Sequence, residues 1–325
     1  MLFDGCTTRL LNHICLSSIV NNRLIAILLA GIIASGMIYT HPAFAHNFGG
    51  DESATWLAKV TEIKTEASIV AKHVGDSTAI DYYSDALGEY WNSNDTKEMG
   101  ERNTLLAQEI PSTINQTLAD ARTPGNQNAV NGDITTLSGY LDESVPVRVG
   151  KDKLNNSTVQ ALSVTFVLKE ALEKYGDAIN STVNLNDMSQ MNMNMSGSSM
   201  MMTSTIVDQN KYENSIGLAS AAQIMFNNVA VKNPDKSDAN TKVSAAFTKL
   251  LQDLNGKADG NTIMIDVHTN LHPVLIDAYQ ISPQSTAGIH NPGLAVPEFP
   301  LPALLIVISI AGVIAATRLK SRIGF

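Results

Sequence analysis

Apolar residues recur at alternating steps of three and four along most of the central chain, a spacing that places them on one face of an α-helix. The first such stripe includes Trp56, Val60 and Ile63, with charged residues such as Glu62 and Glu66 on its flanks. The sequence has no alternating pattern of useful strand length. It therefore predicts an all-α protein of antiparallel helical bundles, with helical segments at 51–74, 78–91, 97–121, 133–141, 153–179, 216–229, 243–254 and 264–278.

Two prolines and one short segment are expected to interrupt these helices. Pro111 and Pro273 each lie inside an apolar stripe. A proline removes one backbone hydrogen bond and clashes with the preceding turn of a helix. We therefore expect a kink or a break at Pro111, a division of the last helix at Pro273, and an extended link at 145–150.

One internal region has a different composition from the rest of the chain. Asn, Ser, Met and Gly dominate residues 180–205, and the apolar residues there have no regular period. Such a segment buries too little apolar surface to offset the entropy of ordering it. We therefore predict two helical units, at 46–180 and 208–281, joined by a flexible linker at 181–207 and followed by a spacer at 282–297.

The N-terminus has the features of a secretory signal. Arg9 and Arg23 provide positive charge, residues 24–38 are apolar, and Ala43-Phe44-Ala45 fits the small-x-small cleavage pattern. We predict a signal peptide at 1–45, and an uncleaved signal anchor is the alternative. In either case the central part of the chain is exported.

The C-terminal residues 298–325 predict a transmembrane helix with a basic tail. The apolar run 301–316, with the residues before it, approaches the roughly 17 to 25 residues that cross a bilayer as a helix. Arg318, Lys320 and Arg322 follow it and are expected to stay in the cytoplasm. The helical body would then lie outside the cell, held to the membrane or cell surface.

A short motif precedes this helix. Pro297, Glu298 and Phe299, followed by an apolar helix and a basic end, resemble the PEF-CTERM class of archaeal protein-sorting signals. The resemblance covers the last 30 residues or so, and Pro300 stands where a Gly is common in one subgroup. It implies an archaeal surface protein and, as a partner, an archaeosortase that cuts near the motif. A plain membrane anchor with a chance motif is the alternative.

Charge and cysteine content narrow the class of protein further. The formal net charge of −9 argues against nucleic acid as a partner. Both cysteines, Cys6 and Cys15, lie in the predicted leader, so the exported body must be stabilised by packing alone. Sequons for N-glycosylation suit a surface glycoprotein and occur at Asn94, Asn115, Asn155, Asn156, Asn180 and Asn194.

The linker also contains the most specific candidate for a metal-binding site. Thioether sulfurs are soft ligands that favour Cu(I). The candidate ligands are Met188, Met191, Met193, Met195, Met200, Met201 and Met202. Cleavage after Ala45 would add the amine and imidazole of His46, an arrangement that resembles the histidine brace of some copper proteins. The alternative is a low-complexity linker in which Met is merely tolerated.

A second candidate for metal binding is a histidine pair. His268 and His272 stand four residues apart on a predicted helix, which would place both rings on one face, as in helical zinc sites. No Glu follows His268 directly, where helical metalloproteases have their base, and no third ligand is evident nearby. Histidines at the surface or at a helix cap are the simpler interpretation.

These observations predict a non-enzymatic protein of the cell envelope with a structural or interaction role, in contact with other envelope proteins. The sequence has no phosphate-binding glycine loop, nucleophile elbow or Cys-His pair. An extracellular hydrolase is therefore the weakest hypothesis. A copper-binding or copper-delivering surface protein is the main alternative.

Overall fold

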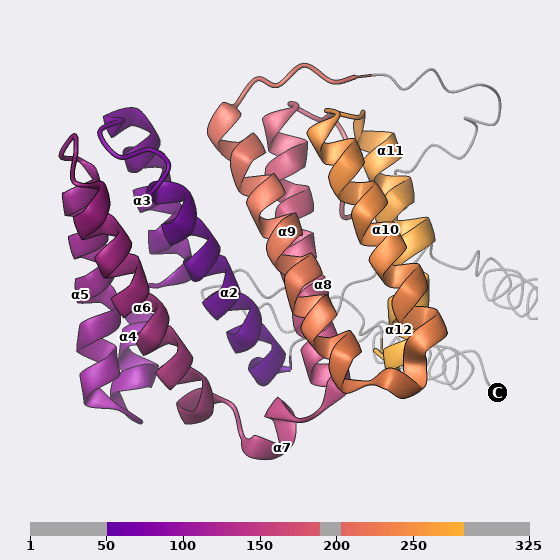
Figure 1. Cartoon of the computed structure of the whole chain (residues 1–325), viewed down its shortest axis with the longest axis horizontal. Helices are drawn as coiled ribbons and strands as arrows, with labels where there is room; N and C mark the ends of the chain where they lie inside the picture. The colour runs from indigo at the N-terminus through magenta and orange to yellow at the C-terminus, as the bar shows by residue number, and fades with distance from the viewer. Residues whose placement is uncertain (1–50, 189–202, 283–325) are drawn as a thin grey trace, which may run out of the picture.

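The computed structural model describes residues 51–188 and 203–282 (Figure 1). Every regular element in these two ranges is helical, which confirms the predicted all-α class. The predicted signal peptide, sorting motif, C-terminal helix and most of the methionine-rich linker lie outside the described residues. Within the described ranges, no helix has both the length and the apolar character needed to cross a bilayer.

The first half of the described chain forms a bundle of helices around one hydrophobic core. Asp51, Asp76, Asn92 and Asn103 begin four of these helices, since each side chain accepts hydrogen bonds from backbone N–H groups of the first turn. The helices of this N-terminal bundle are α2 (Glu52–Val70), α3 (Ser77–Tyr90), α4 (Ser93–Gly100), α5 (Thr104–Ala121) and α6 (Gln127–Arg148).

The second half forms another bundle after the short helix α7 (Lys151–Leu154). Its core contains stacked Phe226 and Phe247, with ring centroids 5.8 Å apart, and Tyr279 edge-on to Phe226 at 6.3 Å. The elements of this C-terminal bundle are α8 (Ser157–Ala178), α9 (Gln209–Lys232), a 3-10 turn (Pro234–Lys236), α10 (Ser237–Asn255), α11 (Gly260–Ile265), a π-helix (Asp266–Leu271) and α12 (His272–Tyr279).

Helix α8 belongs to the C-terminal bundle, although it was predicted to be part of the first helical unit, at 46–180. Leu168, Leu172 and Tyr175 lie in the same core cluster as the residues of α9 to α12. The packing therefore divides the chain near α7, and the methionine-rich segment connects two helices of one bundle. The chain resumes on that bundle, where Val207 N–H donates to Ala178 O at 2.8 Å.

One expected interruption, at Pro273, is confirmed, the extended link expected at 145–150 is wrong, and the helix does not break at Pro111. Helix α5 continues through Pro111 and starts only after a break at residues 101–103, and α6 continues to Arg148, where an extended link was expected. The division at Pro273 is confirmed: a π-helix precedes it, and α12 starts with Pro273 in its first turn. Proline is tolerated there because the first turn needs no intrahelical N–H donor.

Helix α2 lies between the two bundles and packs against both (Figure 1). Ala54 and Ala58 belong to the C-terminal core, whereas Trp56, Val60 and Ile63 belong to the N-terminal core. Two rows of side chains on one helix are therefore buried in different directions, so most of α2 has no solvent-exposed face.

The contact of α2 with α9 is close at Gly217. A Cβ atom added at Gly217 would lie 2.9 Å from Ile69 Cδ1 and 3.1 Å from Thr65 Cγ2. In contrast, a Cβ added at Gly139 of α6 would have no neighbour within 4 Å. The two glycines therefore differ in packing although both lie inside helices.

Substitution of these glycines tests the junction between the bundles. We expect Gly217→Val to lower the free energy of unfolding by about 1–3 kcal/mol, because the added methyl groups overpack the α2–α9 contact. The matched control Gly139→Val should be neutral or slightly stabilising, since valine has a better helix propensity than glycine. Chemical denaturation of both variants measures the difference, and equal effects would contradict the close contact.

Candidate functional site

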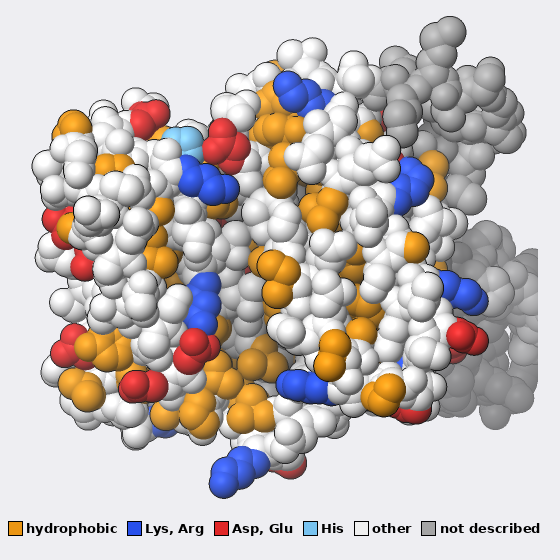
Figure 2. All heavy atoms as spheres, in the orientation of Figure 1, with side chains coloured by type: hydrophobic (Ala, Val, Ile, Leu, Met, Phe, Trp, Pro, Cys, Tyr) orange, Lys and Arg blue, Asp and Glu red, His pale blue; other side chains and the backbone are white. Residues whose placement is uncertain are grey.

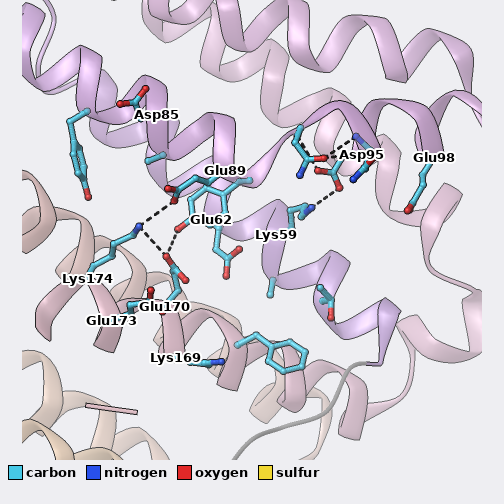
Figure 3. A pocket seen from close by; sticks show the side chains of 18 of the residues that line it. Lys59, Glu62, Asp85, Glu89, Asp95, Glu98, Lys169, Glu170, Glu173 and Lys174 are labelled. Carbon is cyan, nitrogen blue, oxygen red and sulfur yellow. Dashed lines mark hydrogen bonds and ion pairs between the residues drawn. The ribbon is translucent and has the colours of Figure 1, made fainter. Parts of the chain in front are cut away.

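A cleft of about 1170 Å³ opens between the two bundles (Figure 3). Helices α2, α3 and α4 form one wall, and α8 forms most of the other. The row Ala54, Ala58, Glu62 and Glu66 follows steps of four along α2, so it forms one ridge on the side of the C-terminal bundle. The cleft is therefore a consequence of the junction between the bundles.

Ion pairs connect the walls of the cleft. Lys174 Nζ of α8 lies 3.2 Å from Glu170 Oε1 and 3.6 Å from Glu89 Oε2 of α3. Tyr90 Oη donates to Glu170 Oε1 at 3.0 Å. Burial alone would lower the pKa of Lys174, but Glu170 and Glu89 more than offset this and raise it. Figure 3 shows Lys174 extending from α8 toward both carboxylates.

Glu62 lies at the centre of this arrangement and differs from the other acids. Its residue is 9% exposed, and its carboxyl group has no hydrogen bond or ion pair with any described residue. Figure 3 shows it projecting from α2 toward α8, into the cleft. Burial, followed by repulsion from Glu170, raises the pKa of Glu62 to about 8, and Lys59 offsets only part of this rise.

Glu66 lies one turn further along α2 and is 0% exposed. Neither of its carboxyl oxygens has a hydrogen bond of acceptable geometry. The nearby amide of Asn214 lowers the pKa of Glu66 to some extent, but burial is the larger effect and raises it to about 8. Both glutamates are therefore mostly protonated at neutral pH, which is how the fold tolerates two carboxyl groups in this interface.

This site was not predicted from the sequence, in which Glu62 and Glu66 stand on the flanks of an apolar stripe, where a glutamate is usually solvated. In the structure both side chains are buried. A signal was present: Ala54 and Ala58 precede the two glutamates in the same row, and small apolar residues at steps of four indicate a second packed face. Because two faces of α2 are packed, the row that contains Glu62 and Glu66 is covered by the C-terminal bundle.

The histidine pair predicted from the sequence is close together but not at the surface. His268 and His272 are each 3% exposed, and their rings lie 5.3 Å apart in an edge-on arrangement. His268 Nε2 donates to Leu185 O at 2.7 Å. The described residues include no group of three or more His, Cys, Asp or Glu side chains that could hold a metal ion.

The other predicted site residues divide between the described and undescribed parts of the chain. Met188 is the last residue described before the gap and is partly buried. His46, Asn194, the sorting motif Pro297-Glu298-Phe299 and the remaining methionines of the tract lie outside the described residues. The described sequon asparagines are all exposed, namely Asn94, Asn115, Asn155, Asn156 and Asn180.

Comparison with known proteins finds no matching family model, no matching curated protein and no matching solved structure.

Glu66→Gln tests the buried protonated carboxyl group. The folded pKa of about 8 exceeds the ordinary value of 4.5, so the folded state holds the proton more tightly than the unfolded state. The contribution of Glu66 to stability should therefore be complete below pH 4.5 and be lost as the pH rises through 8. The neutral Gln should remove this pH-dependent loss, of the order of a few kcal/mol.

Unfolding free energies at several pH values between 4.5 and 9 measure this effect. The control is Glu101→Gln, because Glu101 lines the same cleft but is exposed. We expect the control to keep the pH dependence of the wild type. An unchanged slope in Glu66→Gln would show that Glu66 is ionised in the folded state.

Proposed function

We propose that this chain is an exported protein of the archaeal cell envelope, anchored at its C-terminus, whose helical body has a non-enzymatic binding role. The observation that carries the binding role is the cleft at the junction of the bundles, with the buried carboxyl group of Glu62 directed into it. Concave sites that combine apolar walls with a few convergent polar groups are typical of ligand-binding sites.

Two further features support an extracellular position, and a third concerns the partners of the protein. The described body contains no cysteine and is held together by two apolar cores and side-chain caps. Its described sequon asparagines are exposed, as glycosylation requires. Acidic and basic side chains are interspersed over the face seen in Figure 2, a distribution suited to contacts with other envelope proteins but not to a polyanion such as nucleic acid.

Labelling of intact cells tests the location. An impermeant amine-reactive reagent should modify exposed lysines such as Lys97 and Lys151 without disruption of the membrane. Mass spectrometry of the same protein should find His46 as the first residue and the end of the chain, including Phe325, removed. Labelling only after lysis would contradict export, and an intact Phe325 would contradict processing by an archaeosortase.

Copper binding is the second candidate function, and one contact favours it. The methionine-rich tract begins three residues after Leu185, whose carbonyl oxygen accepts the hydrogen bond from His268. Leu185, three residues before the first methionine, is thereby held at His268, whose ring lies 5.3 Å from that of His272. Thioether and imidazole groups both suit copper. In this alternative the protein binds Cu(I) at the cell surface and delivers it to a partner.

Replacement of the methionines at 188–202 by leucine separates these two functions. Leucine keeps the size and apolar character of each side chain and removes the sulfur. If copper binding is the function, the full chain should bind Cu(I) and the leucine variant should lose most of the bound metal. Measurement of copper per chain checks this, and equal copper content in both proteins, or none in either, would eliminate the copper hypothesis.

A further inference from the structure

The cleft contains an uncompensated acidic centre. More carboxylates than lysine ammonium groups line it. Lys174 is shared by Glu89 and Glu170, and Lys59 pairs with Asp95. Glu62 therefore remains without a cation partner among the described residues, although its residue is nine-tenths buried and its side chain projects into the cleft (Figure 3).

Aromatic and small apolar groups line the same space. Tyr82 and Tyr90 contribute from α3 and Phe166 from α8, while Ala58 and Ala86 complete an apolar wall. The faces of aromatic rings attract cations, most strongly cations that are weakly hydrated. The combination of a buried carboxylate, aromatic rings and methyl groups matches a ligand that carries both positive charge and hydrocarbon.

We propose that this cleft binds a small organic ammonium ion, whose positive charge pairs with the Glu62 carboxylate while its carbon substituents pack against the aromatic wall. This inference rests on the binding role proposed above and names the class of ligand. A bare metal ion fits less well, since the described residues offer no group of three or more suitable ligands. An anion fits less well, because carboxylates outnumber lysines around the cleft and Glu62 projects into it.

Binding of such a cation is coupled to a proton. Glu62 faces Lys59 and Glu66 on its own helix, Glu170 and Lys174 on α8, and Glu89 and Tyr90 on α3. This environment raises the pKa of Glu62 to about 8, so the carboxyl group is mostly protonated at neutral pH. The ligand must displace that proton, and its affinity should increase as the pH rises through 8.

The test is calorimetric titration of the purified full-length chain with choline, a quaternary ammonium whose charge does not change with pH. We expect the affinity at pH 9 to exceed that at pH 6 by about tenfold or more, because Glu62 ionises over this interval. At pH 7, titrations in two buffers with different ionisation enthalpies should show release of a proton on binding. Sodium chloride at equal ionic strength serves as the control for unspecific charge effects.

Three variants separate the role of Glu62 from that of the aromatic wall. Glu62→Gln keeps the shape of a side chain that is already neutral at pH 7, and it should weaken choline binding by about tenfold or more and abolish proton release. Glu101→Gln removes an exposed carboxylate from the same cleft and should change the affinity by about twofold at most. Phe166→Leu, which removes only the aromatic face, should weaken binding while proton release persists.

The outcomes distinguish this inference from the proposed function. The ammonium site is wrong if the wild type binds no choline up to about 10 mM at pH 9, which corresponds to an affinity weaker than about −3 kcal/mol. It is equally wrong if Glu62→Gln binds choline as the wild type does. Either result leaves the cell-surface labelling unaffected, whereas failure of that labelling would contradict export and leave the choline titration standing.

Discussion

The burial of helix α2 on two sides is the constraint on which the rest of the structure depends. A helix at the edge of a bundle buries one stripe and keeps a solvated face. Helix α2 buries Trp56, Val60 and Ile63 in one core and Ala54 and Ala58 in another. Because few positions remain for solvent, the glutamates that continue the second row are removed from water and held as neutral acids. The cleft, the raised pKa values and the division of the chain all follow from this helix.

Most of the longer helices were predictable, because each of them buries a stripe at the helical period. The partners of each helix were not, since periodicity defines a face and does not say which helix covers it. Helix α8 illustrates this limit: Val164, Leu168 and Leu172 stand in one row at steps of four, but Val167 lies on another side of the helix and is also fully buried. Apolar residues around most of a helix indicate a central position in a bundle, and this signal favoured the observed packing.

The candidate site was less predictable than the fold, for two physical reasons. A Glu at steps of four beside lysines is usually a solvated flank, and only the packing of α8 and α9 over α2 changes the environment of Glu62 and Glu66. The histidine pair was predicted to share one face, and His268 and His272 do lie together. Both are buried, His268 within the π-helix and His272 directly after it, and this change of helical geometry has no periodic signature in the sequence.

The free-energy cost of burying Glu62 indicates that this residue has a role beyond packing. A buried carboxyl group without a partner costs stability that an apolar side chain of similar size would not cost. Glu66 is fully enclosed and held neutral, so it is closed to a ligand. Glu62 instead reaches a cleft from which a solute can approach. Its raised pKa results first from burial and then from repulsion by Glu170. A cation in the cleft would compensate the unfavourable burial of the Glu62 carboxylate.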